Sequence, residues 1–237
     1  MNQVARKKIV FIIVEGPSDD TALGLLFNRF YQNKQVYIQI LHRDITTENG
    51  VNPSNIISSV CNEIKTYAKA NHLNSSHFHE IIHITDTDGA FINNESIIED
   101  NAIANICYSE TEIRTPNKSN IESRNQQKSA NLTKLSSCSQ IWGIPYHIFY
   151  MSCNLDHVLY NKLNSSDEEK ENDAFLFAKQ YKDNIPGFTA FISQSDFSVP
   201  GSYSDTWKYI KEYLHSLERH TNLGLCFLQE ENGENPS

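Results

Sequence analysis

Three acidic residues near the start of the chain stand where runs of apolar residues end. Glu15 follows the run KKIVFIIV, residues 7–14. Asp86 and Asp88 follow the run HEIIHIT, residues 79–85. Alternate residues that leave a strand point to the same side, so both aspartates can face one cation. Carboxylate oxygens suit Mg²⁺ or Mn²⁺, which share their coordination with phosphate, and the spacing therefore predicts chemistry on a phosphate ester.

The three carboxylates would divide the work of phosphodiester hydrolysis. A cation held by Asp86 and Asp88 would polarise the ester, activate water and steady the leaving oxygen. Glu15 would act as general base or as ligand of a second ion. Each segment alone has an ordinary structural explanation, because Glu-Gly-Pro and Thr-Asp-Thr-Asp-Gly are common turn sequences. The two together favour a functional site, since each ends a buried strand of one predicted unit.

The order of predicted elements brings these carboxylates to one edge of a sheet. Apolar, β-branched runs predict strands at 7–14, 35–41 and 79–85. Helical spacing predicts a helix over 18–31 and another from Asn52 to about residue 70. This β-α-β-α-β alternation implies a parallel sheet with right-handed crossovers. Ligands bind beyond the carboxyl ends of such strands, so that edge is where the site is expected.

The remainder of the chain divides by composition. Residues 91–140 are polar and rich in Asn and Ser, and we interpret them as an insertion that is partly helical. After them the pattern predicts a strand at 145–152 and helices at 154–163, 167–181 and 203–220. The fold class is therefore α/β, a parallel sheet flanked by helices with a polar insertion and a helical C-terminal part. The predicted parts are the first half of the core (1–90), the insertion (91–140), the rest of the sheet with the C-terminal helices (141–229) and an acidic tail (230–237).

VEGPSD at 14–19 and ITDTDG at 84–89 together resemble the two signatures of the Toprim domain. Topoisomerases, bacterial primases and OLD-family nucleases share this domain, in which a glutamate ends the first strand and an Asp-x-Asp pair ends the third. The resemblance covers about the first 90 residues and implies a Toprim-like parallel sheet. It makes Glu15, Asp86 and Asp88 the catalytic and metal-binding triad, with Mg²⁺ or Mn²⁺ as cofactor.

Two further metal ligands follow from the resemblance alone. Asp19 falls where several nuclease members carry a second acidic residue after the Glu-Gly turn. YMSCNLDHVLY, residues 150–160, is similar to the segment after the fourth strand of RloB-like Toprim proteins, where an acidic residue precedes an apolar helix. Asp156 is the match to that acidic residue.

Departures from the larger Toprim proteins narrow the expected function. The sequence contains no GxxxxGK[ST] loop and no cysteine-rich zinc module, since its five cysteines are scattered. What the resemblance then implies is a stand-alone endonuclease, paired by analogy with a separate ATPase subunit in phage defence (abortive infection), and a homo-oligomer is considered as well. The alternative is a non-catalytic Toprim-like subunit that regulates or binds a partner. DNA and RNA both stay open as substrate.

Charge bears on how a nucleic acid would be held. The net charge of −9 argues against a generally basic binding surface, although bound divalent cations would neutralise acids where a phosphate approaches. Local contacts to the nucleic-acid backbone are assigned to the following residues: Arg43, Arg114, Lys118, Arg124 and Lys128.

Hydropathy separates this chain from membrane proteins. No apolar run approaches the roughly 20 residues that a bilayer span needs. The N-terminal run is short, holds Glu15 and lacks a small-residue cleavage site, so it is interpreted as a strand and not as a signal peptide. We therefore expect a cytoplasmic protein.

Overall fold

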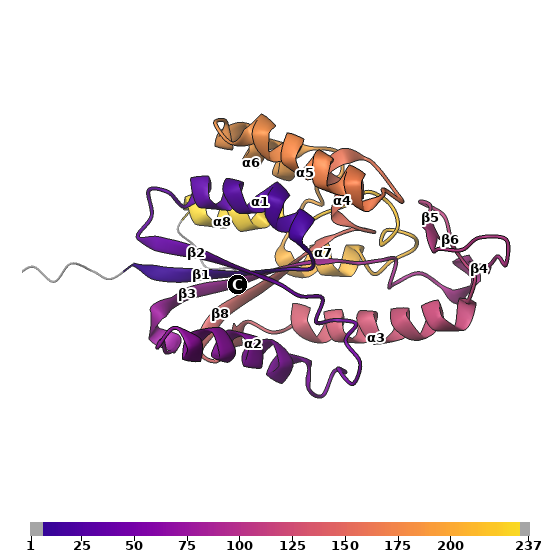
Figure 1. The fold of residues 1–237 in the computed structure, drawn as a ribbon, viewed down its shortest axis with the longest axis horizontal. Helices are drawn as coiled ribbons and strands as arrows, with labels where there is room; N and C mark the ends of the chain where they lie inside the picture. The colour runs from indigo at the N-terminus through magenta and orange to yellow at the C-terminus, as the bar shows by residue number, and fades with distance from the viewer. Residues whose placement is uncertain (1–6, 233–237) are drawn as a thin grey trace, which may run out of the picture.

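A five-stranded sheet in the order β2-β1-β3-β8-β7 organises the computed structural model, which describes residues 7–232 (Figure 1). The first four strands in that order pair in parallel, and β7 joins β8 as an antiparallel neighbour. The chain is thus an α/β protein with a mixed, mostly parallel sheet. The strands of this sheet are β1 (Lys8–Val14), β2 (Val36–His42), β3 (Phe78–Asp86), β7 (Gln140–Ile141) and β8 (Ile144–Met151).

Helices cover both faces of the sheet, which explains why its central strands read as continuous apolar runs. Val10 and Ile12 of β1 pack into a core with the helices on one face, and Phe11 and Ile13 pack into a second core on the other face. In Figure 1, α1, α5, α6 and α8 lie above the sheet, and α2 and α3 lie below it. The helices are α1 (Pro17–Phe30), α2 (Ile56–Ala70), α3 (Lys118–Ser136), α4 (Leu155–Tyr160), α5 (Asp167–Tyr181), α6 (Ile185–Gln194), α7 (Tyr203–Tyr209) and α8 (Gly224–Asn232).

The strands and helices predicted before residue 90 are all present. Pro17 lies in the first turn of α1, where its missing N–H leaves no hydrogen bond unmade. The backbone N–H of Gly16 donates to Oδ2 of Asp19 at 3.0 Å, which fixes the Glu-Gly turn against the start of the helix. A carboxylate in the first turn is also favoured by the helix dipole.

The polar segment 91–140 folds back onto the rest of the molecule. It contains the long helix α3 and a second, three-stranded sheet in the order β4-β6-β5. Leu132 and Leu135 of α3 are fully buried in the core beneath the main sheet, while Ile121 packs near the small sheet. α3 therefore connects the two sheets, as Figure 1 shows. The strands of the small sheet are β4 (Ile97–Glu99), β5 (Cys107–Tyr108) and β6 (Ile113–Thr115), and two 3₁₀ turns occur at Ser75–His77 and Asn94–Ser96.

The C-terminal part differs from the prediction in three respects. The helix predicted over 203–220 is wrong beyond Tyr209, because the chain then bends and Tyr213 adopts a positive φ of 49°. The helix predicted over 154–163 ends at Tyr160, where Asn161 with φ 55° forms a left-handed cap. α6 and α8 were not predicted. The last five residues of the predicted acidic tail, 233–237, lie outside the described residues.

The helices within residues 7–232 include none with both the length and the apolar character needed to cross a membrane.

Substituting Ile82 tests the contribution of the central strands. Ile82 is fully buried on β3, between two parallel neighbours. We expect Ile82→Ala to lower the free energy of unfolding by about 2–5 kcal/mol, because it removes buried methyl groups and leaves a cavity. Leu25→Ala, at a position on α1 that is 41% exposed, should change it by no more than about 0.5 kcal/mol. Urea unfolding followed by circular dichroism measures both, and equal losses would contradict the packing described.

A candidate active site at the carboxyl edge of the sheet

Glu15 and Asp86 meet because β1 and β3 are neighbouring parallel strands. Oε1 of Glu15 accepts a hydrogen bond from the backbone N–H of Asp86 at 3.0 Å. The same oxygen accepts one from Oγ1 of Thr85 at 2.8 Å. The predicted convergence of the two strand ends is therefore present, and Glu15 is held in place by the residues that end β3.

The Thr-Asp-Gly turn after β3 is fixed by segments that lie far along the chain. The backbone N–H of Asp88 donates to the carbonyl of Cys153 at 2.8 Å, and Asp88 itself has a positive φ of 50°. Oγ1 of Thr87 donates to the carbonyl of Ser216 at 2.8 Å and accepts from the N–H of Cys153 at 2.9 Å. The turn is thus held between the exit of β8 and the bent segment after α7, and Oδ2 of Asp88 contacts Nζ of Lys128.

Gly89 is required by this turn for two reasons. Its φ of +66° lies in the left-handed region, and a Cβ atom there would stand 2.6 Å from Cδ2 of Leu217 and 3.0 Å from Cδ1 of Ile113. A larger residue would push the turn away from its neighbours, and Asp88 would move with it.

Lys128 lies among the carboxylates. Its side chain is fully buried, and Nζ forms ion pairs with Oδ2 of Asp88 and, at 3.1 Å, with Oε1 of Glu15. A third carboxylate oxygen, Oδ2 of Asp44, lies 4.0 Å from Nζ. Burial alone would lower the pKa of Lys128, but Asp88, Glu15 and Asp44 outweigh it and hold that pKa well above its usual value. The assignment of Lys128 to a nucleic-acid contact is therefore corrected, because its side chain has no exposed surface and its ammonium is enclosed by acids of the same chain.

Helix α3 positions Lys128 from both sides. Arg124 donates to the backbone carbonyl of Asp88 at 2.7 Å, and Asn125 donates to that of Gly89 at 3.1 Å. On the other side, Gln127 donates to the carbonyl of Val51 at 2.9 Å. These bonds join α3 to the Asp88 turn and to the loop after β2, so the ammonium has little freedom to move.

Asp44 is a site residue that sequence reasoning did not assign. It follows β2, and its carboxylate accepts hydrogen bonds from the N–H and Oγ1 of Thr46, at 3.0 and 2.8 Å, and from Oγ1 of Thr47 at 2.5 Å. Burial would raise the pKa of Asp44, but Lys128 and the two threonines lower it below its usual value. The sequence signal is Asp44-Ile45-Thr46-Thr47 directly after a predicted strand, a pattern in which an aspartate bonds to the turn that follows it.

Among the described residues, Asp86 has neither the hydrogen bonds nor the close ammonium that stabilise the charge of Asp44. No residue in 7–232 donates a hydrogen bond to its carboxylate or forms an ion pair with it. Burial, followed by repulsion from Glu15, Asp19 and Asp88, raises the pKa of Asp86 well above its usual value. This acid would gain the most from a bound cation.

Asp19 and Asp156 are two further buried carboxylates at this edge, and Asp19 differs in accepting the N–H of Gly16. Both side chains are buried, and Oδ1 of Asp156 has no hydrogen-bond partner among the described residues. The nearest cation to Asp156 is Nζ of Lys170, 3.9 Å from Oδ2. Burial raises the pKa of Asp156 to about 6, and Asp19 adds to that rise by repulsion. The pKa of Asp19 is itself raised by burial.

The donor chemistry around Asp86 and Asp156 fits a hard divalent cation, because the Asp86 carboxylate and Oδ1 of Asp156 are desolvated and receive no hydrogen bond from the described residues. In the orientations described, no three acidic, His or Cys side chains of residues 7–232 are arranged as a ligand set. The residues that would hold an ion are Asp86 with Asp19 and Asp156.

The other predicted nucleic-acid contacts do not gather into one basic surface. Arg43 pairs with Glu48 at 2.5 Å and with Glu63 at 2.9 Å. Arg114 pairs with Glu112 at 2.6 Å within the small sheet. Further along, Nζ of Lys118 lies 4.0 Å from an oxygen of Glu122. Of the five assigned residues, the structure brings only Arg124 and Lys128 to the acidic cluster.

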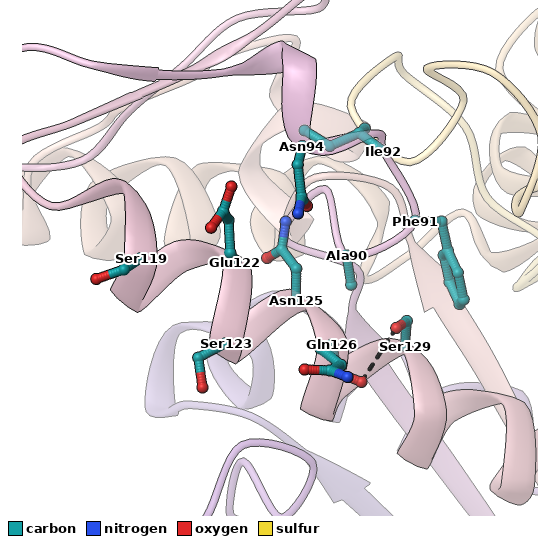
Figure 2. Close-up of a pocket in the computed structure, with 10 residues that line it drawn as sticks. All are labelled: Ala90, Phe91, Ile92, Asn94, Ser119, Glu122, Ser123, Asn125, Gln126 and Ser129. Atoms are coloured by element: carbon teal, nitrogen blue, oxygen red, sulfur yellow. Dashed lines mark hydrogen bonds between the residues drawn. The ribbon is translucent and has the colours of Figure 1, made fainter.

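A polar pocket of about 640 Å³ opens between α3 and residues 90–94. Figure 2 shows Glu122, Asn94 and Asn125 gathered toward one another, with Phe91 at the opposite end. No lysine or arginine lines this pocket, so it suits uncharged polar groups better than a phosphate. Asn125 links it to the acidic cluster, because its side chain donates to the backbone of Gly89.

Comparison of the chain with protein-family models, with curated proteins and with solved structures finds no match in any of the three.

The protonation of Glu15 gives a test of the cluster in cation-free buffer. Burial raises the pKa of Glu15 from 4.5 to about 8, against the opposing effect of Lys128. The folded protein then holds a proton that the unfolded chain has released. The contribution to stability is full below pH 4.5 and is lost as the pH rises to about 8, with a slope of at most about 1.4 kcal/mol per pH unit.

Glu15→Gln should remove this contribution while keeping the shape of the side chain. We expect the difference in unfolding free energy between variant and wild type to change with pH across that window and to be flat below it. Urea titrations at intervals between pH 4 and 8.5 measure the difference. Parallel curves for the two proteins would show that Glu15 ionises as it does in the unfolded chain.

Proposed function

We propose that this chain is an endonuclease that hydrolyses phosphodiester bonds with the help of Mg²⁺ or Mn²⁺. The observation that carries the proposal is the junction of two strand ends, in which Oε1 of Glu15 accepts the backbone N–H of Asp86 at 3.0 Å. A glutamate after the first strand and an Asp-x-Asp pair after the third is also what the Toprim resemblance implies. The geometry of the β1–β3 pair supports that reading.

The residues of the chain would take distinct parts in the reaction. When bound, the cation supplies Lewis-acid polarisation of a phosphoryl oxygen. Asp86, Asp19 and Asp156 would bind and orient it. Glu15, with its raised pKa of about 8, is suited to accept the proton of the attacking water, because a general base works best with a pKa near the working pH.

The polar pocket beside the site extends the proposal to the substrate. A nucleotide next to the cleaved bond would present sugar hydroxyls and base edges, which are uncharged and polar. The pocket between α3 and residues 90–94 offers amide and hydroxyl groups for these contacts. The wider expectations of a separate ATPase subunit, a homo-oligomer and a role in phage defence rest on the resemblance alone.

Cleavage assays on Asp86→Asn and Glu15→Gln test the proposal. With Mn²⁺ present, single- and double-stranded DNA and RNA are offered as substrates, and EDTA defines the background. We expect each variant to lose at least about 10²-fold in cleavage rate, because a proton acceptor or a metal ligand is gone. Lys208→Ala, which removes an exposed ion pair with Asp205 on α7, should cleave like the wild type.

The fold of each variant is checked by circular dichroism before its rate is interpreted. Folded Asp86→Asn and Glu15→Gln proteins that cleave at the wild-type rate would contradict the proposal.

One observation favours a second function, that of a non-catalytic regulatory or partner-binding subunit. The ion pairs of Lys128 with Glu15 and Asp88 satisfy part of the acidic cluster within the chain, as a purely structural ion pair would. On this alternative the wild type cleaves none of the substrates under any divalent cation. The same assay therefore distinguishes the two functions.

A further inference from the structure

The six carboxylates at the sheet edge fall into two groups that differ in how their charge is balanced. One group surrounds the ammonium of Lys128 and contains Glu15, Asp44 and Asp88. The other contains Asp19, Asp86 and Asp156. We call the first the lysine side and the second the open side. The chain supplies a buried cation to one side only.

On the lysine side the charges are matched at close range. Nζ of Lys128 lies 3.1 Å from Glu15 and 4.0 Å from Asp44, and it is in direct contact with Asp88. Asp44 receives additional hydrogen bonds from Thr46 and Thr47. A compact ammonium among three carboxylates supplies positive charge where a cation would otherwise be needed to balance them.

The open side has no buried ammonium among the described residues that would correspond to that of Lys128. Oδ1 of the buried Asp156 has no partner among the described residues, and the carboxylate of Asp86 receives no hydrogen bond from them. The one nearby ammonium, that of Lys170, approaches only Oδ2 of Asp156 and belongs to a side chain that is 38% exposed. These unpartnered oxygens are the available positions for an external cation.

Lys128 is held too firmly to give way to an ion. Its side chain has no exposed surface. The helix that carries it is bonded to the Asp88 turn through Arg124 and to the loop after β2 through Gln127. A second divalent cation between Glu15 and Asp88 would have to sit within a few ångströms of a fixed ammonium, where repulsion between like charges is strong.

We infer that Lys128 takes the place of a second metal ion, so that the chain binds one divalent cation, on the open side, and not two. The inference deepens the proposed function in that it accepts a divalent cation at this edge of the sheet. It does not require that the chain cleaves nucleic acid, because it concerns the number and the position of bound ions.

Counting bound Mn²⁺ tests the inference directly. The free ion is quantified by electron paramagnetic resonance in titrations of the full chain with Mn²⁺ alone. The wild type should bind one ion. Asp86→Asn should weaken that binding at least tenfold, whereas Asp88→Asn should leave the count at one, because Asp88 belongs to the lysine side.

Lys128→Met provides the complementary variant. Removing the ammonium leaves three carboxylates without their cation, so the variant should bind a second Mn²⁺ at the vacated position. Its melting temperature should also rise more on addition of Mn²⁺ than that of the wild type. Lys134→Met, at an exposed position of the same helix, should bind one ion and melt like the wild type.

Three outcomes would overturn the inference. They are two ions bound by the wild type, no ion bound by it, or loss of the ion in Asp88→Asn with retention in Asp86→Asn. The Asp86→Asn and Asp88→Asn comparison decides even where Lys128→Met fails to fold.

Failure of the proposed function is distinguishable from these outcomes. A wild type that binds one Mn²⁺ on the open side but cleaves no substrate would reject the nuclease and support the inference. A wild type that cleaves nucleic acid but binds two Mn²⁺ ions would support the nuclease and reject the inference.

Discussion

The arrangement of this sheet edge depends on one constraint: the buried ammonium of Lys128 must be surrounded by opposite charges. A buried charge is tolerated only where opposite charges and hydrogen bonds replace its water, and Glu15, Asp44 and Asp88 do so around Lys128. Those carboxylates come from the ends of three different strands. The ion pairs therefore join β1, β2 and β3 to α3, and removing Lys128 would leave three carboxylates without their shared cation.

This constraint explains why a polar segment folds so closely onto the sheet. α3 offers few apolar side chains, and a helix of that composition has little hydrophobic reason to pack. Besides the buried Leu132 and Leu135, its attachment uses side chains that donate to backbone carbonyls, such as Arg124 to Asp88 and Asn131 to Thr46. Polar anchoring of this kind is directional, so it fixes the position of the helix more closely than apolar packing would.

The sequence predicts the strands that position the site better than it predicts the contacts between the site's side chains. The strands around Glu15 and Asp86 are evident from apolar runs covered on both faces, and parallel order then brings their ends together. The part played by Lys128 is not evident, because its acidic partners come from three separate strand ends. The helix predicted over 203–220 fails for a related reason. Its buried residues keep a helical spacing, but the chain bends near Tyr213 so that Ser216 can bind the turn after β3.

Charge balance also determines how this chain can meet a polyanion. The net charge is −9, and the side chains of Arg43 and Arg114 are already paired with acids. Cations paired in this way are less available to displace counterions from a nucleic-acid backbone, so the acidic net charge would oppose general electrostatic attraction to a polyanion. Under the proposed function, a phosphate would approach the sheet edge at an ion held by Asp86, because the side chain of Lys128 has no exposed surface. On that proposal, recognition would depend on the bound ion and on uncharged contacts such as those of the adjoining pocket.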